Sequence, residues 1–103
     1  MTKRKINKTI AEHLGWKELS FSYCKQIIGN RPFFKNGKIV SYTVDQYVPD
    51  YCRDLNAIHE AEKVLTTAQT TDMSQYLHRR LGMLWGFATA SQRAEAFLRT
   101  IGK

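Results

Sequence analysis

The chain has 103 residues, of which 43% are hydrophobic and 24% are charged, and its formal net charge is +7 at pH 7. This length supports one hydrophobic core, so we predict a single domain over residues 1–103, in which residues 1–7 form a basic N-terminal tail. The sequence contains neither an apolar run of about 18 residues nor the apolar segment of a signal peptide, which excludes a membrane span and predicts a cytoplasmic protein.

The positive charge is concentrated in the N-terminal third of the sequence. Nine basic residues precede Ile39 and are opposed only by Glu12 and Glu18, whereas basic and acidic residues cancel beyond this point. The nine residues are Lys3, Arg4, Lys5, Lys8, Lys17, Lys25, Arg31, Lys35 and Lys38. We predict that they form a basic surface for an anionic partner, either nucleic acid or an acidic protein face. A solvated tail with scattered surface lysines is the alternative.

The first elements are predicted from caps and from alternation. Asn7 is a suitable N-cap for a short helix over Lys8–Leu14, and Gly15 provides the left-handed stop. Apolar and polar residues alternate over 18–23, which predicts a half-buried strand. Gly29-Asn30 is then interpreted as a turn.

Asn36-Gly37 is the strongest local signal, because both residues tolerate the positive φ angles of a two-residue type I′ hairpin. A turn of this kind pairs Lys35 with Lys38 and Phe34 with Ile39. Lysines on both sides of a turn also have a purely structural role, since they protect an exposed strand edge.

The segment after the turn alternates apolar and polar residues. One face would carry Val40, Tyr42, Val44 and Val48, which predicts a long strand with one apolar face and one wet face. The hairpin and one further strand make a small antiparallel sheet. With three to four helices, they define an α+β fold.

Asp54 predicts the start of a central helix, because its carboxylate can accept hydrogen bonds from the first-turn amides. The predicted buried stripe of this helix contains Leu55, Ile58, Ala61, Val64 and Leu65. The polar segment Thr66–Thr71 is predicted to be a connection. Thr71 or Asp72 is predicted to be the N-cap of a third helix, which ends at Leu81.

The last helix has the clearest end signals. Thr89 and Gln92 form a capping box, and Gly102 stops the helix. The apolar segment Met83–Trp85, just before it, is predicted to cover one end of the core.

Three segments together resemble the phage ABA sandwich family. They are I-A-E-x-L-G-W at Ile10–Trp16, P-x-Y-x-x-D-L-N-A-x-H-E-A-E-K at Pro49–Lys63 and F-A-T-A-x-Q-R-A-E-A-F-L-R-T-x-G-K at Phe87–Lys103. The resemblance implies a bacteriophage or prophage origin and a fold with α/β/α layers. It implies no catalytic residues, because the family has no established activity.

No arrangement of residues predicts catalysis, a metal site or a cofactor. The segment His59–Lys63 begins like the zinc-protease motif H-E-x-x-H, but a lysine replaces the second histidine. The glycine-rich phosphate-binding loops and the motif G-x-S-x-G are missing. Cys24 and Cys52 are expected to be free thiols, since a reducing compartment disfavours a disulfide.

A small polar pocket is a second candidate site. Tyr51, Asp54, Asn56 and His59 would place donors and acceptors at a helix start, where free amides favour an anion. The alternative is an ordinary cap beside a partly buried histidine.

We therefore expect a non-enzymatic, phage-encoded binding protein that inhibits a host macromolecule by protein–protein contact. A nuclease-based defence complex of the CRISPR type is the leading expected target. The alternative is a basic accessory protein that binds nucleic acid directly, with aromatic residues of the basic third as stacking platforms.

Overall fold

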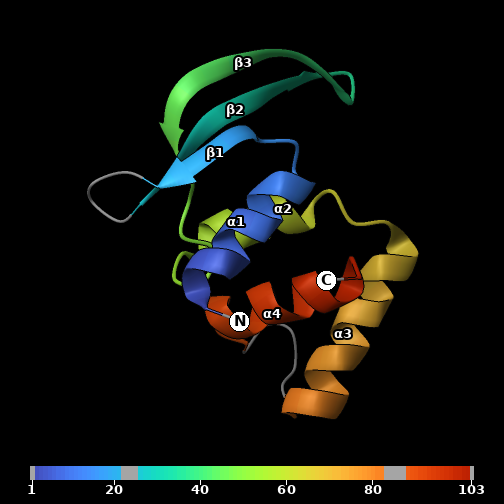
Figure 1. Ribbon diagram of the computed structural model, residues 1–103. Helices are drawn as coiled ribbons and strands as arrows, with labels where there is room; N and C mark the ends of the chain where they lie inside the picture. Colours follow the sequence, from blue (N-terminus) through green and yellow to red (C-terminus); the bar gives the residue numbers. More distant parts are fainter. Residues whose placement is uncertain (1, 22–25, 83–87, 103) are drawn as a thin grey trace. The chain divides into compact units, whose positions relative to one another are not determined.

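The protein is described by a computed structural model, which places residues 2–21, 26–82 and 88–102 (Figure 1). These residues form four helices and one three-stranded antiparallel sheet, which confirms the predicted α+β class. In chain order, the elements are α1 (Lys3–His13), β1 (Lys17–Phe21), β2 (Ile27–Lys35), β3 (Lys38–Tyr47), α2 (Leu55–Glu62), α3 (Thr67–Leu81) and α4 (Ala90–Thr100).

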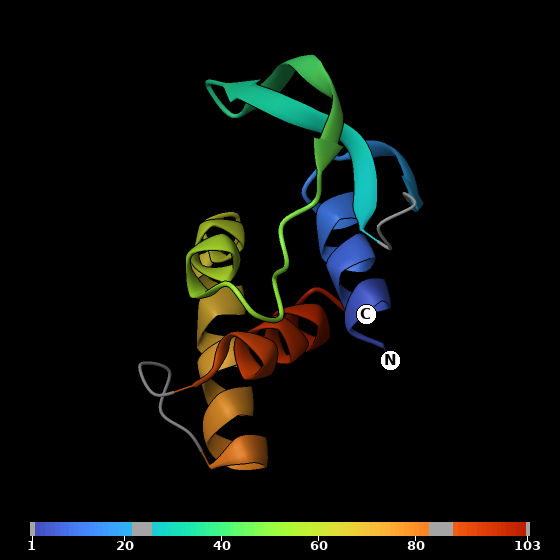
Figure 2. The ribbon, with the colours of Figure 1, turned by 90° about the vertical axis from the view of Figure 1, so that its left-hand side faces the viewer.

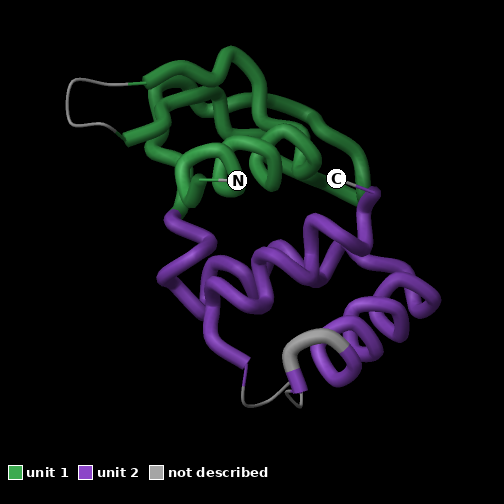
Figure 3. Tube along the Cα trace, turned by 60° about the horizontal axis from the view of Figure 1, so that its bottom comes forward, with its two compact units in different colours: residues 1–49 green, residues 50–103 purple. Residues whose placement is uncertain are grey.

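The chain divides into two compact units, residues 1–49 and residues 50–103, where the sequence predicted one domain (Figure 3). Unit 1 holds α1 and the sheet, and unit 2 holds α2, α3 and α4. Nine basic and three acidic residues give unit 1 a formal charge of +6, and seven basic and six acidic residues give unit 2 a charge of +1. The chain's positive charge is therefore a property of unit 1.

Helix α1 begins five residues earlier than predicted. Thr2, not Asn7, is the N-cap, and its Oγ1 accepts a hydrogen bond of 3.2 Å from the amide of Lys5. The basic residues that we expected in a tail therefore lie in the first turns of a helix, where lysine and arginine have favourable propensities. After the helix, Gly15 has a φ of +98°, as expected for the predicted stop.

The sheet has the order β1-β2-β3, and the predicted hairpin turn is confirmed. Asn36 and Gly37 have φ angles of 54° and 76°, and Lys35 pairs with Lys38 and Phe34 with Ile39. Figure 2 shows the two long strands of this hairpin curving together away from the turn.

The predicted turn at Gly29-Asn30 is wrong, because both residues lie inside β2. Gly29 is buried, and it pairs with Gln46 of β3. The reason for a glycine here is close packing. A Cβ at this position would lie 2.5 Å from Leu19 Cδ2 and 3.0 Å from the carbonyl oxygen of Lys17.

Replacing Gly29 with alanine is expected to destabilise unit 1 by about 1–3 kcal/mol. The Leu19 side chain must move, and the Lys17 carbonyl is backbone that cannot yield without disturbing the pairing of β1 with β2. Urea unfolding measures the loss. Ser41→Ala on the exposed strand β3 is the control, with an expected change within about 0.5 kcal/mol. Equal stabilities of the two variants would contradict the close packing.

Strand β3 has no buried face, which corrects the predicted alternation. Val44 is 63% exposed and Val40 is 56% exposed. The pairing of β3 with β2 shifts twice, once between Phe33 and Phe34 of β2 and once between Gly29 and Arg31. Each shift places an extra residue in β3, and a bulge of this kind interrupts the strict in–out alternation on which the prediction depended.

Two of the predicted helix caps in unit 2 are confirmed. Asp54 is the N-cap of α2, as predicted, but α2 ends at Glu62, and Leu55 and Val64 of the expected stripe are exposed. The capping box of Thr89 and Gln92 is confirmed for α4.

Helix α3 starts at Thr67, and its N-cap, Thr66, lies five to six residues before the predicted cap at Thr71 or Asp72. The cause is a second capping box, in which Thr66 Oγ1 accepts from the Gln69 amide at 3.2 Å and the Gln69 side chain accepts from the Thr66 amide at 2.9 Å. The predicted polar connection is therefore the first turn of a helix. The fully buried large side chains of the unit are Ile58, Met73, Leu77 and Phe97. The predicted apolar cover at Met83–Trp85 lies outside the described residues.

Candidate functional site

The structure places six of the nine predicted basic residues in two regions of unit 1. Arg4, Lys5 and Lys8 lie together on α1, which also carries Lys3. Lys35 and Lys38 face each other across the hairpin turn. The remaining three are Lys17, which starts β1, Arg31 in β2, and Lys25, which lies outside the described residues.

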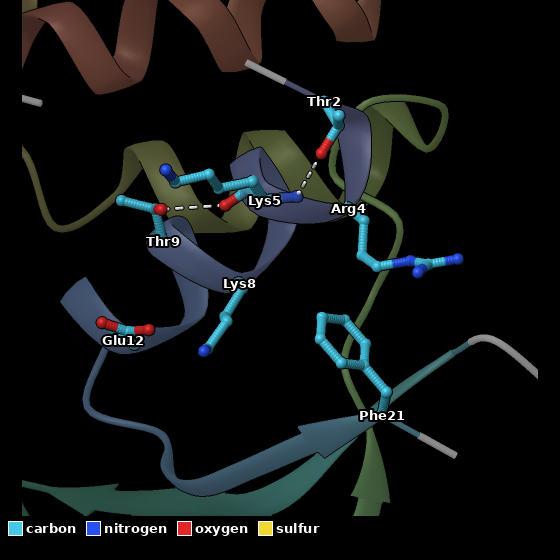
Figure 4. Close-up of a pocket in the computed structure, with 7 residues that line it drawn as sticks. All are labelled: Thr2, Arg4, Lys5, Lys8, Thr9, Glu12 and Phe21. Atoms are coloured by element: carbon cyan, nitrogen blue, oxygen red, sulfur yellow. Dashed lines mark hydrogen bonds between the residues drawn. The ribbon is translucent and has the colours of Figure 1, made fainter. Parts of the chain in front are cut away.

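A pocket of about 400 Å³ lies between the first turns of α1 and the end of β1 (Figure 4). It is lined by Thr2, Arg4, Lys5, Lys8, Thr9, Glu12 and Phe21. The lining residues of α1 recur every three or four positions, so they share one side of the helix. We call this region the α1 pocket. Its last lining residue, Phe21, is contributed by β1.

Arg4 and Phe21 form the most specific contact of the α1 pocket. The guanidinium carbon of Arg4 lies 5.0 Å from the centre of the Phe21 ring, within the range of a cation–π interaction. Figure 4 shows the Arg4 side chain reaching toward this ring. Phe21 was predicted to be a core residue of a strand, but it is 55% exposed. The contact joins residues 17 positions apart, and no sequence pattern announces it.

Within the part of the chain that the structure describes, Arg4, Lys5 and Lys8 form no close ion pair, and Glu12 is the one carboxylate that lines the α1 pocket. The ion pairs found among the described residues involve Asp50, Glu60 and Glu62, and none includes Arg4, Lys5 or Lys8. The pocket therefore presents positive charge that an anionic ligand could neutralise.

Arg31 has a different role from the lysines of the hairpin. Its guanidinium carbon lies 5.9 Å from the ring centre of Trp16, and Trp16 is buried. This contact fixes Arg31 against the core of unit 1. Arg31 is therefore less suited than Lys35 and Lys38 to bind a partner.

The β2–β3 hairpin exposes an unusual number of large apolar side chains. Seven of the ten large hydrophobic residues described as exposed lie on it, with exposures of 38–63%. We call these seven residues the hairpin surface: Phe33, Phe34, Ile39, Val40, Tyr42, Val44 and Tyr47. Exposed apolar side chains gathered on one element and bordered by charges are typical of protein interaction sites.

The predicted small polar pocket is not assembled as expected. Asp54 Oδ1 accepts from the amides of Asn56 and Ala57 at 2.9 and 3.3 Å, so this carboxylate acts as the helix cap. Tyr51 is buried, whereas the Asn56 and His59 side chains are exposed. Asp54 is therefore an ordinary helix cap, as the alternative interpretation of this residue predicted.

His59 instead belongs to a cluster that joins α2 to α4. Arg93 donates to Glu62 through Nε at 2.7 Å and through Nη2 at 2.6 Å, and Nη2 lies 3.5 Å from His59 Nδ1. The Glu62 and Arg93 side chains are 6% and 12% exposed, so this is a buried, bidentate ion pair. The sequence did not indicate it, because Glu62 and Arg93 are 31 positions apart.

Glu60, on the same helix, has a perturbed titration. Its Oε1 accepts a hydrogen bond of 2.8 Å from Lys63 Nζ, and this bond together with the ammonium charge lowers the pKa of Glu60. A depressed pKa in the folded state stabilises the fold above the pKa of the unfolded carboxyl group. This contribution is lost as the pH falls through the folded pKa.

Replacing Lys63 with alanine is expected to raise the pKa of Glu60 toward its ordinary value, because it removes the hydrogen bond and the ammonium charge, which are the two largest causes that lower this pKa. An NMR titration of the Glu60 carboxyl carbon measures the change. Lys5→Ala, in the other unit, is the control and is expected to leave this titration unchanged. An unshifted Glu60 in the Lys63 variant would show that Lys63 is not the partner in solution.

Among the described residues, no three His, Cys, Asp or Glu side chains gather as they would around a metal ion. Cys52 is buried, and Cys24 lies outside the described residues, so the expectation of two free thiols stays a prediction. None of the described helices combines the length and the apolar character that a membrane crossing requires.

Comparison with known proteins adds no relative. No family model matches this sequence, and neither the curated proteins nor the solved structures contain a match. The resemblance to the phage ABA sandwich family and the predicted α/β/α layering remain predictions.

Proposed function

We propose that this chain is a non-enzymatic binding protein of a bacteriophage, which inhibits a host macromolecule in the host cytoplasm by protein–protein contact. An anti-defence role against a CRISPR-type complex is the form of this function that the sequence favours. The observation that carries the proposal is the hairpin surface, with seven exposed apolar side chains beside Lys35 and Lys38.

The composition of the hairpin surface favours a protein partner. Aromatic residues, which dominate the energetics of protein interfaces, supply four of its seven side chains, and three aliphatic residues complete it. Nucleic acid would leave most of these aliphatic groups without complementary apolar contacts. The two lysines of the turn then favour a partner with an acidic rim, since complementary charge accelerates association.

Capture from host cells tests this function. The chain with a C-terminal tag, expressed in its natural bacterial host, is expected to retain a host protein or ribonucleoprotein complex through washing at high salt. The same complex is expected to lose activity when the purified chain is added. Retention of nucleic acid alone, or a captured complex whose activity the chain leaves intact, would contradict the proposal.

A further inference from the structure

The α1 pocket is separate from the hairpin surface and has a different chemistry. It combines three cations of one helix with one exposed aromatic ring. We infer that the α1 pocket binds single-stranded nucleic acid, with a phosphate against Arg4 and Lys8 and a base stacked at Phe21. The inference is independent of the proposed function, because it uses α1 and β1 instead of the hairpin.

The charge of the α1 pocket suits a phosphate. Arg4 and Lys8 are one helical turn apart, and neither takes part in a described ion pair. Figure 4 shows the Lys8 side chain extending from α1 on the side that faces β1, where Arg4 also lies. A phosphate diester that entered here would meet donors from two successive turns and would release the counterions that these cations otherwise attract.

Phe21 distinguishes the site from a simple anion site. The cations alone would bind an anion, whereas the aromatic ring can stack with a base. More than half of this residue is exposed, although a phenylalanine is among the residue types most often buried. Single-stranded nucleic acids stack bases on such rings, and an arginine near the ring adds a cation–π contribution. The Arg4 guanidinium, 5.0 Å from the ring centre, is placed for this arrangement.

Glu12 sets the orientation of the ligand. It lines the α1 pocket two helical turns from Arg4, so its carboxylate repels a phosphate from that end. The phosphate is therefore expected near Arg4, at the end of the α1 pocket that also holds Phe21.

Size favours a nucleotide over a single acidic side chain. A volume of about 400 Å³ lies within the range of pockets that hold small ligands of drug-like size, about 300–1,000 Å³. An aspartate or glutamate of an acidic protein would neutralise the lysines but would leave the face of Phe21 unused. The aromatic ring thus distinguishes between the two kinds of anionic partner.

Fluorescence anisotropy of the full chain with a short labelled oligothymidine tests the inference. Binding is expected at low ionic strength, with a log–log salt slope of about −0.7 for the one phosphate that the α1 pocket neutralises. Phe21→Leu keeps an apolar side chain but removes the ring, so it is expected to weaken binding at least about fivefold. Phe21→Trp is the matched control and is expected to retain binding.

A second pair of variants separates a site from general positive charge. Arg4→Gln/Lys8→Gln and Lys35→Gln/Lys38→Gln remove the same charge from unit 1. The first pair is expected to remove most of this salt dependence, and the second is expected to leave it unchanged. Circular dichroism confirms that each variant is folded.

Three results would overturn the inference. They are the absence of oligothymidine binding at low ionic strength, equal effects of the two double variants, and unchanged affinity in Phe21→Leu. An oligoglutamate that binds in place of oligothymidine, and that requires Arg4 and Lys8, would assign the α1 pocket to an acidic protein instead.

Discussion

Replacing Glu62 with alanine is expected to lower the free energy of unfolding of unit 2 by about 3–5 kcal/mol. The substitution leaves the guanidinium of Arg93, only 12% exposed, without the carboxylate that now accepts two of its hydrogen bonds. The cost arises mainly from removing the carboxylate beside a buried guanidinium, because a well-paired buried ion pair contributes little net stability itself.

Native-state hydrogen exchange is the appropriate measurement, because it reports on each unit separately. Amides of α2 and α4 are expected to lose protection in Glu62→Ala, while those of α1 keep it. Lys63→Ala is the matched control: it breaks the exposed pair with Glu60 on the same helix turn and is expected to cost less than about 1 kcal/mol. Similar losses in the two variants would show that the Glu62–Arg93 pair is not buried in solution.

A double replacement tests the origin of this effect. Glu62→Leu/Arg93→Met removes both charges and keeps most of the buried volume, so it is expected to recover most of the stability that Glu62→Ala loses. The pair would then act mainly in specifying how α2 meets α4.

Substitution of the hairpin surface is expected to abolish capture of the protein partner. Phe33→Thr/Val44→Thr removes two apolar side chains that are 59% and 63% exposed and keeps residues with high strand propensity. A central aromatic residue of an interface typically contributes about 2 kcal/mol or more, so partner binding is expected to weaken at least about thirtyfold.

Stability is the internal check on the hairpin variant. Both side chains are exposed, and their replacement is expected to change the unfolding free energy by no more than about 0.5 kcal/mol each. Val64→Thr removes an apolar side chain that is 52% exposed in unit 2 and is the control for capture. Undiminished capture by the hairpin variant would move the interface to another surface.

Features encoded by neighbouring residues were predictable from the sequence. The Asn36-Gly37 turn, the Asp54 cap and the capping box of Thr89 are local signals, and the structure confirms all three. The capping box of Thr66 and Gln69 has the same local pattern, but we predicted a connection there because the segment is polar. Local chemistry therefore predicted the helix ends better than composition did.

Features that depend on packing were not predictable. Arg4 meets Phe21 only because β1 ends beside the first turns of α1, and Glu62 meets Arg93 only because α2 packs on α4. The exposure of β3 depends on two bulges whose positions are set by pairing with β2. The sequence indicated the basic residues and offered the aromatic residues of the basic third as stacking platforms, but the placement of Phe21 beside Arg4 required the structure.

The two bulges of β3 also bear on how the free chain behaves at high concentration. β3 lies at the edge of the described sheet, and a regular, apolar edge strand is a template for pairing between copies that can end in fibres. The bulges displace successive amides from a straight row, and Lys38 brings like charges together when two such edges approach. The chain can thus display apolar side chains without polymerising. The same geometry leaves side-chain contact, instead of strand addition, as the means by which the hairpin engages a partner.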